Sequence, residues 1–206
     1  SMKDLTLRLR PEGHYSIVAV EDRSSRVKLF APHGGYIEPC TGRIISELAG
    51  GEFDYFIFRG EMHRYCHATL HVASVNYDEP ICERMIGNAE TALSVHWCQP
   101  AESLIEVGGG NERYSRRLGE LLAREGYTVV PGTHGMRGID EKNFINRCTR
   151  AGVQLELSAG FRRSLFPGFP RETQTHPMEF PKFIGVVRAW LLEIEGELSS
   201  IAAKGT

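Results

Sequence analysis

The sequence has few of the features that mark secreted, fibrous or membrane proteins. Its five cysteines are odd in number and scattered, with no Cys-x-x-Cys pair. We therefore expect reduced thiols, and neither a disulfide framework nor a cysteine-rich zinc knuckle. The apolar stretch at residues 184–192 is interrupted by Arg188 and falls far short of the roughly 20 residues that a membrane helix needs. Internal repeats and low-complexity tracts are absent, which excludes collagen-like and disordered chains.

An excess of positive charge is also missing. The chain has 24 lysines and arginines against 26 aspartates and glutamates, a formal net charge of −2. This balance gives no general attraction to phosphate backbones or anionic membranes, so neither nucleic acid nor a membrane is expected as a partner. The start of the chain has no basic segment followed by an apolar one, which predicts a cytoplasmic protein without a secretion signal. Residues 1–2 are expected to be a cloning remnant.

The sequence does have enough apolar residues for one hydrophobic core. It has 206 residues, of which 41% are hydrophobic and 9% aromatic. A chain of this length buries about 70% of the surface that it exposes when unfolded. We therefore expect a single domain over residues 1–206.

Short β-rich runs alternate with amphipathic helical segments along the chain. Strands are expected at residues 14–20, 26–32, 53–58, 68–74, 92–97, 103–109, 127–130 and 152–158, and helices at 42–50, 81–90, 112–126 and 182–203. A glycine-rich turn at 33–35 and a loop with four prolines at 166–181 lie between them. This order predicts an α/β fold: a mixed, mostly parallel sheet with helices on both faces and chemistry at the carboxyl ends of the strands.

Three residues with metal-binding side chains stand at those strand ends. His33 and Glu38 follow the second expected strand, and His96 ends the strand at 92–97. Three ligands of this kind, with water in the fourth position, form a hydrolytic zinc site. His-x4-Glu is a weak signal by itself, since a capping histidine and a solvated glutamate give the same spacing. His71 is a rival ligand, but inside the expected strand 68–74 a buried role supporting a ligand is favoured.

Other residues could act on a substrate beside such a metal. Glu156, in the strand at 152–158, could take a proton from water and return it to a leaving amine, or it could be an edge-strand residue facing water. Arg162 and Arg163 suit a substrate carboxylate, because a guanidinium donates two parallel hydrogen bonds. Arg162 is favoured, since in an extended chain it shares the parity of Glu156. Asn146 and Arg147 are further candidates for substrate binding, or they lie on a helix surface.

Five motifs begin at residues 31, 70, 93, 106 and 146 and read APHGGYIEP, LHVASVNYDEP, LSVHW, EVGGGNE and NRCTRAGVQLELSAGFRR. In their order and similar spacing, they resemble the motifs of the phage and bacterial poly-γ-glutamate hydrolase family. The resemblance covers roughly residues 14–165. It implies a zinc-carboxypeptidase-like α/β fold, cleavage of γ-glutamyl amide bonds, Zn²⁺ held by His33, Glu38 and His96, and Glu156 as general base. Asn76 stands where the family often has histidine, so specificity could differ.

The sequence thus predicts a zinc-dependent hydrolase that cleaves an amide bond, of γ-glutamyl type, in a peptide or polymer by zinc-activated water. A phage-encoded member would be released on lysis. The alternative is a phage-associated nucleic-acid-binding or replication accessory protein without hydrolase activity. The balanced charge argues against it, because the basic residues are spread through the chain. A zinc-binding domain that has lost activity is a third reading, but every residue that the chemistry needs is present.

Overall fold

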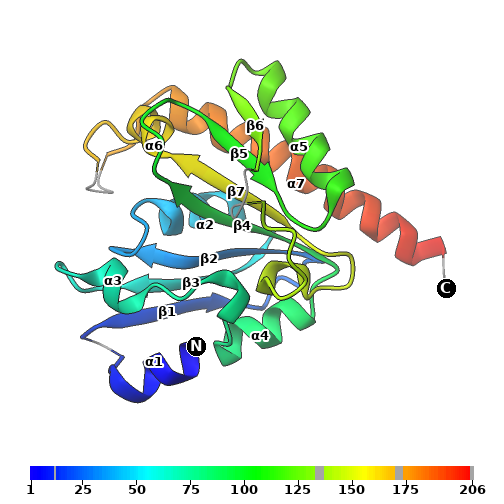
Figure 1. Ribbon diagram of the computed structural model, residues 1–206. Coiled ribbons are helices and arrows are strands. Elements are labelled where there is room, and N and C mark those ends of the chain that lie inside the picture. Colours follow the sequence, from blue (N-terminus) through cyan, green and yellow to red (C-terminus); the bar gives the residue numbers. More distant parts are fainter. Residues whose placement is uncertain (12, 133–136, 170–173, 205–206) are drawn as a thin grey trace.

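The computed structural model describes residues 1–11, 13–132, 137–169 and 174–204 (Figure 1). Within these ranges the strands form one seven-stranded sheet in the order β1-β3-β2-β4-β7-β5-β6. The strands are β1 (Tyr15–Val20), β2 (Val27–Gly35), β3 (Asp54–Gly60), β4 (Thr91–Cys98), β5 (Ile105–Gly108), β6 (Val129–Pro131) and β7 (Val153–Ser158). Strands β3, β2, β4 and β7 are parallel neighbours, β1 pairs antiparallel with β3, and β5 antiparallel with β7. The expected mixed, mostly parallel sheet is confirmed.

Helices pack on both faces of this sheet, as expected. On the face that we name face A lie α2 (Thr41–Ala49), α5 (Glu112–Arg124), α6 (Ala159–Leu165) and α7 (Glu179–Lys204), whose apolar side chains share one core with β2, β4, β5 and β7. Face B carries α1 (Met2–Arg8), α3 (Cys66–Leu70), α4 (Pro80–Gly87) and the 3-10 turn η2 (Phe144–Asn146), which pack in a second core. A further 3-10 turn, η1, spans Ser74–Asn76.

The strand predicted at residues 68–74 is wrong. Residues 66–70 form α3 instead, and residues 71–73 run on as an irregular segment to η1. Both edges of the preceding strand β3 are taken, because β1 and β2 flank it in the sheet. The segment therefore has no free edge of β3 to pair with, and it buries Leu70 in the face-B core from a short helix.

Other boundaries also differ from those predicted. Strand β2 continues through the expected glycine-rich turn to Gly35, with a register shift between Ala31 and Gly34. Gly35 has φ +64°, and a Cβ there would lie 2.3 Å from the carbonyl oxygen of Gly60, so only glycine fits. Helix α7 begins at Glu179, with Pro181 in its first turn, where the missing N–H costs little. The predicted loop at 166–181 is thus shorter, and its residues 170–173 lie outside the described ranges.

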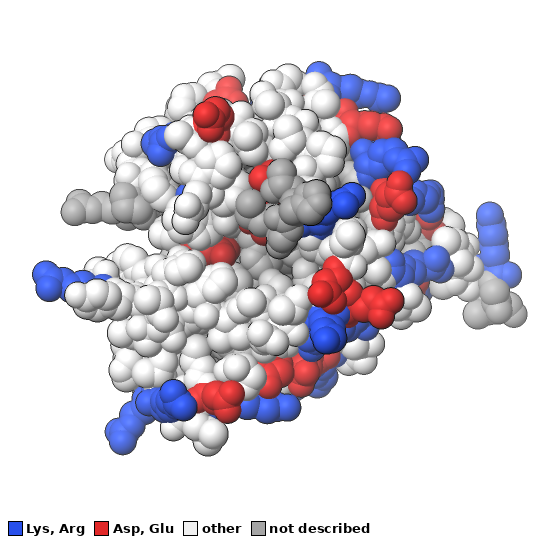
Figure 2. Space-filling model, in the orientation of Figure 1, with Lys and Arg blue, Asp and Glu red and all other residues white. Residues whose placement is uncertain are grey.

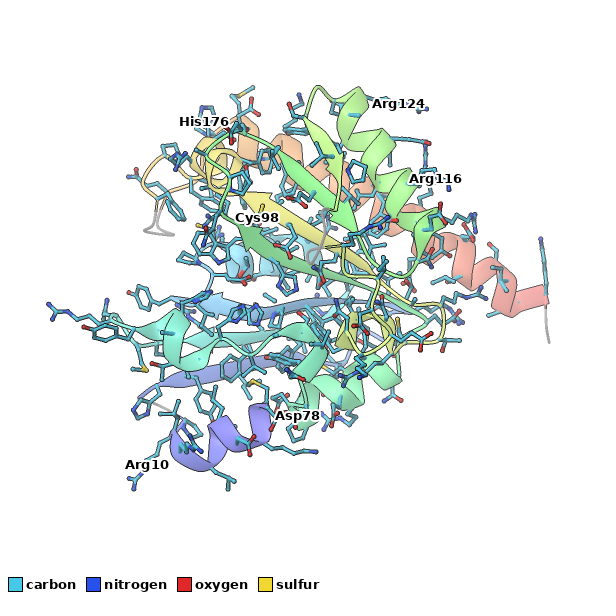
Figure 3. The ribbon with its side chains drawn as sticks, viewed as in Figure 1. Arg10, Asp78, Cys98, Arg116, Arg124 and His176 are labelled. Atoms are coloured by element: carbon cyan, nitrogen blue, oxygen red, sulfur yellow. The ribbon has the colours of Figure 1, made fainter. Side chains whose placement is uncertain are left out.

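The described helices include none that is both long enough and apolar enough to cross a membrane. The parallel strands β2, β4 and β7 all point the same way, to the left in Figure 1, so their carboxyl ends meet at one edge of the sheet. Cys98, the last residue of β4, is labelled at this edge in Figure 3.

Candidate active site and metal centre

A pocket of about 460 Å³ opens on face B near the carboxyl ends of β2, β4 and β7. Its floor holds His33, Glu38, His96 and Glu156, one wall is made by residues of the segment 71–75, and the other by residues 137–140. Figure 2 shows a hollow on this side of the molecule, with acidic atoms visible inside it. The structure therefore brings the predicted metal ligands and the predicted base into one cavity.

Glu38 lies among three histidines. Its Oε1 is 2.9 Å from Nδ1 of His33 and 3.5 Å from Nε2 of His71, and its Oε2 is 3.6 Å from Nδ1 of His96. Burial alone would raise the pKa of Glu38. The charge and the hydrogen bond of His33, together with the nearby rings of His71 and His96, outweigh burial and hold that pKa well below its usual range. Glu38 is thus a buried carboxylate kept in its charged, metal-binding form.

The local backbone places His33 and Glu38 side by side. The Glu38 N–H donates to the carbonyl of His33 at 2.7 Å and closes the turn between them. The Thr41 hydroxyl, in the first turn of α2, donates to the carbonyl of Glu38 at 2.9 Å. The four residues between His33 and Glu38 therefore form a tight turn that directs both side chains to one point.

The hydrogen bonds of His33 leave room for a cation. Nε2 of His33 lies 2.8 Å from the carbonyl oxygen of Val72, which can only accept, so Nε2 carries the ring proton. In a neutral ring, Nδ1 then presents a lone pair to Glu38 Oε1, which also only accepts. Two lone pairs 2.9 Å apart need a proton or a metal ion between them. A metal-binding histidine commonly donates its other N–H to a backbone carbonyl in this way.

Two more polar atoms of the cluster have no hydrogen-bond partner among the described residues. Glu38 Oε2 and His96 Nε2 are buried, and no described residue forms a hydrogen bond with them. An unpaired buried polar group is costly, and such groups are rare unless they serve a ligand. The donor set, one carboxylate and imidazoles, is the set that hydrolytic zinc sites use. The residues present therefore fit a zinc ion.

His71 was predicted to be a buried residue inside a strand. It instead follows α3 in an irregular segment, and 30% of its side chain is exposed. Its ring packs on that of His33, with 4.1 Å between centroids. Among the described residues, one set has ligand atoms that all lie within 4.8 Å of one another, and it consists of His33, Glu38 and His71. His71 is thus a fourth candidate ligand beside His33, Glu38 and His96, and the reason for setting it aside does not hold.

Glu156 projects from β7 into the same pocket. It is paired in register with His96 on β4 and is 6% exposed. Burial, and then the charge of Glu38, raise the pKa of Glu156 well above its usual range, while a hydrogen bond from Gln154 opposes the rise. A carboxyl group with these surroundings favours the protonated form more than an ordinary glutamate does, as expected of a group that exchanges protons.

Arg162 lies on α6, and the parity argument for it is wrong because the chain leaves β7 for a helix capped by Ser158. Its guanidinium is completely buried, and none of its nitrogens has a hydrogen-bond partner among the described residues. It is held instead between two rings, 4.0 Å from the centroid of Trp97 and 4.6 Å from that of Phe169. Burial lowers the pKa of Arg162 to about 10, so it is still charged at neutral pH. Since Trp97 lines the pocket, Arg162 lies one aromatic ring behind its wall.

The other three predicted substrate-binding residues are not among the residues that line the pocket. Arg163 is exposed and donates to the carbonyl of Ala101. Asn146 donates to the carbonyls of Gly138 and Asp140 in one wall. Arg147 donates to the carbonyls of Tyr77 and Lys142, at 3.1 and 2.7 Å, beside the two walls. Asn146 and Arg147 thus support the walls from behind.

Sequence reasoning missed two buried amides near the pocket floor, Gln154 and Asn143, both of which line the pocket. Gln154 had a detectable signal, because it stands two residues before Glu156 and so faces the same side of the strand. Asn143 had none, since it lies in an irregular segment before β7, where neither strand nor helix periodicity says which way a side chain faces. Asn76, the residue that departs from the family pattern, ends η1 and is exposed beside the pocket residues Ser74 and Val75.

Two proteins of Bacillus subtilis are similar to this chain in sequence. UPF0714 protein YndL of Bacillus subtilis (strain 168) is 32% identical over 179 residues, which are 84% of this chain and 70% of YndL. UPF0714 protein YmaC of the same organism is 25% identical over 182 residues, 86% of this chain and 77% of YmaC.

Two solved structures are similar over nearly the whole chain. A YndL structure described as apo and zinc-free has a TM-score of 0.83 at 30% identity, and the match covers 90% of this chain and 93% of that one. A bacteriophage poly-gamma-glutamate hydrolase has a TM-score of 0.87 at 25% identity, with 95% and 96% covered. The profile of the family described as poly-gamma-glutamate hydrolase matches residues 1–186. On this evidence the chain belongs to the poly-gamma-glutamate hydrolase family.

Proposed function

We propose that this protein is a zinc-dependent hydrolase that cleaves γ-glutamyl amide bonds. The observation that carries the proposal is the buried Glu38 carboxylate among three histidines, with atoms on Glu38 and His96 that form no hydrogen bond to any described residue. Such an arrangement is costly in the absence of a cation and stable with one. The zinc-free description of the similar YndL structure supports zinc as that cation.

His33, Glu38 and His96 would hold the zinc, and His71 is the alternative third ligand. When bound, zinc supplies Lewis-acid chemistry: it polarises the scissile carbonyl and lowers the pKa of water. The Val72 carbonyl fixes the ring of His33 so that Nδ1 is the atom available to the metal. The turn that joins His33 to Glu38 keeps both groups in place without help from the metal.

Glu156 would act as the general base and then as the general acid. Its carboxylate takes a proton from the attacking water and gives it to the leaving nitrogen, so it ends the cycle unchanged. Its position in register with His96, one of the proposed ligands, supports this role. Its raised pKa makes the protonated form accessible for the second transfer.

The proposed substrate is a glutamyl peptide or polymer, as the family description suggests. Glutamyl compounds carry carboxylates, and the floor of the pocket is acidic, so binding requires positive charge nearby. Arg162 supplies one such charge behind Trp97, close to the pocket but out of contact with solvent. Among the substrate residues predicted from the sequence, it is therefore the one best placed to favour a substrate carboxylate. Arg163, Arg147 and Asn146 would act at longer range or through the walls.

The nucleic-acid-binding alternative has less support. Arginines are frequent on α5, but three of them form ion pairs with glutamates: Arg113 with Glu197, Arg116 with Glu112 and Arg117 with Glu193. Figure 3 shows Arg116 and Arg124 on the outer side of this helix. On the face shown in Figure 2, basic and acidic side chains are interspersed. A surface of paired charges attracts phosphate groups weakly.

The test combines metal analysis with a hydrolysis assay. Wild-type protein should contain about one zinc ion per chain and release fragments from γ-glutamyl oligomers. Glu156→Gln is the matched variant, because the amide keeps the shape of the side chain while it removes the base. It should retain zinc and lose a factor of about 100 to 10,000 in kcat. Wild-type protein that holds zinc and leaves γ-glutamyl, α-glutamyl and simple acyl-amino-acid substrates intact would contradict the hydrolase proposal.

A further inference from the structure

A chain of hydrogen bonds leads from the backbone of η2 to the proposed base. The Ile145 N–H donates to Oδ1 of Asn143 at 3.2 Å. Nδ2 of Asn143 donates to Oε1 of Gln154 at 2.9 Å. Nε2 of Gln154 then donates to Oε1 of Glu156, also at 2.9 Å. Two buried amides thus connect a fixed backbone group to the carboxylate on the pocket floor.

The direction of these hydrogen bonds follows from the first donor, the Ile145 N–H. A backbone N–H can only donate, so the oxygen of Asn143 must face Ile145 and the nitrogen must face Gln154. The same nitrogen lies 3.5 Å from the carbonyl of Gly138, which is a second acceptor. Gln154 must then turn its oxygen toward Asn143 and its nitrogen toward Glu156. Each amide has one orientation that satisfies its neighbours, and the last donor meets the carboxylate.

Burial of these side chains makes any other orientation of the two amides costly. Asn143, Gln154 and Glu156 are 4%, 5% and 6% exposed, so water cannot replace a lost partner freely. Gly138, with φ +64°, packs directly on Gln154: a Cβ at this glycine would lie 2.9 Å from the Gln154 Oε1 atom. The side chain of Gln154 is therefore held from two sides, by a hydrogen bond and by contact with the wall.

We infer that Asn143 and Gln154 are positioning residues that orient Glu156 for proton transfer. They occupy Oε1 of Glu156 with a donated hydrogen bond and leave Oε2 as the oxygen that takes a proton from water. As the water oxygen bonds to the scissile carbonyl carbon, its O–H bond breaks and the proton passes to Oε2. When the C–N bond then breaks, the same proton goes to the leaving nitrogen. This inference rests on the proposed function of Glu156 and adds the residues that decide which oxygen reacts.

Asn143→Asp tests the direction of these hydrogen bonds, because it replaces one NH₂ group by an oxygen. Aspartate can still accept from the Ile145 N–H, so the local turn is kept. It cannot donate to Gln154, which then turns its nitrogen toward residue 143 and its oxygen toward Glu156. Two acceptors face each other and Glu156 loses its fixed position. We expect kcat to fall about 10- to 100-fold, with KM and zinc content nearly unchanged.

Asn111→Asp is the matched control. Asn111 also accepts a backbone N–H, from Tyr114, and donates its amide to a carbonyl, that of Arg150, but it caps α5 away from the pocket. The same chemical change there should alter stability and leave kcat at the wild-type value. Gln154→Met is the second test variant, because it removes the amide from the other end of the chain and keeps an unbranched apolar side chain of similar length.

The decisive measurement repeats both substitutions in the Glu156→Gln background. If Asn143 and Gln154 act through Glu156, each should change the residual rate there by less than about twofold, since groups that act as one unit are not additive. Wild-type kcat in Asn143→Asp and Gln154→Met would overturn the inference, as would an equal loss with and without Glu156. Normal turnover in Glu156→Gln alone would instead contradict the proposed general base, so the two failures are distinguishable.

Discussion

On β4 and β7, odd and even positions face opposite sides of the sheet, and both sets are almost completely buried. The face-A residues are Leu93, Val95, Val153, Leu155 and Leu157, each 0% exposed. The face-B residues near the pocket are Ser94, His96, Gln154 and Glu156, each 6% exposed or less. Burial is therefore the same on the two sides, while the chemistry is opposite.

This difference shows that depth in the molecule does not distinguish a core from a site. The face-A residues gain free energy because apolar surface leaves water and packs against helices. The face-B residues cost free energy, since their polar groups lose water and some of them, such as His96 Nε2, form no hydrogen bond within the described part of the chain. Polar groups kept at such a cost favour a functional role for this end of face B.

The largest effect should come from removing a proposed metal ligand on face B. His33→Ala and His96→Ala should each lose stoichiometric zinc, because two protein ligands bind the ion far more weakly than three. The fold should survive, since both residues lie at the carboxyl edge of the sheet and belong to neither apolar core. Elemental analysis and circular dichroism measure the two quantities. Full zinc occupancy in both variants would show the ligand set to be wrong, and His71→Ala would then be tested first.

The next prediction truncates an apolar core residue on face A. Leu155→Ala should lower the free energy of unfolding by about 2–5 kcal/mol, because it leaves a cavity under the helices of face A. The variant should keep its zinc content and its kcat when it is assayed well below its melting temperature, because Gln154 and Glu156 lie on the other side of β7. Urea denaturation and kinetics on the same preparation would show this separation. A loss of kcat as large as the one in Glu156→Gln would mean that the two sides of β7 are not independent.

A smaller effect is expected at Arg162, behind the pocket wall. Arg162→Met removes the positive charge and keeps a side chain that can pack between Trp97 and Phe169. We expect kcat/KM to fall about tenfold for a γ-glutamyl substrate with a free α-carboxylate and less for the amidated substrate. Equal values for the two substrates on wild-type protein would argue against carboxylate recognition. A variant that still discriminates would move the role to Arg163 or Arg147.

The smallest effect concerns the stability of the metal-free protein. The pKa of Glu156 is raised in the fold, so its contribution to stability is full below the unfolded pKa and is lost as pH rises through the folded pKa. Glutamine does not titrate. Zinc-free Glu156→Gln should therefore gain in Tm relative to zinc-free wild type as pH rises from about 4.5, by about 2–4 °C for each kcal/mol. A constant Tm difference between pH 4 and 8 would show that Glu156 is not strained by burial.

Much of the architecture was predictable because it depends on local patterns. Alternating strand and helix signals predicted the mixed sheet with helices on both faces, and the structure confirms both. The rule that parallel strands present their carboxyl ends at one edge was enough to group His33, Glu38, His96 and Glu156, which share one pocket. The strand at 68–74 failed because a short run of alternating residues has no signal for whether a sheet edge is free.

Residue spacing along the chain was sufficient for the class of fold, the family and the residue types at the strand ends, because these follow from short-range periodicity and from motifs in order. The tertiary packing placed His71 beside Glu38, Arg162 behind Trp97 and Asn143 against Gln154. Each of these contacts joins segments that no local pattern relates, and it depends on how α3, α6 and η2 lie against the sheet. Side chains on such segments acquire their partners only when the whole core has formed, since packing of distant elements sets their position.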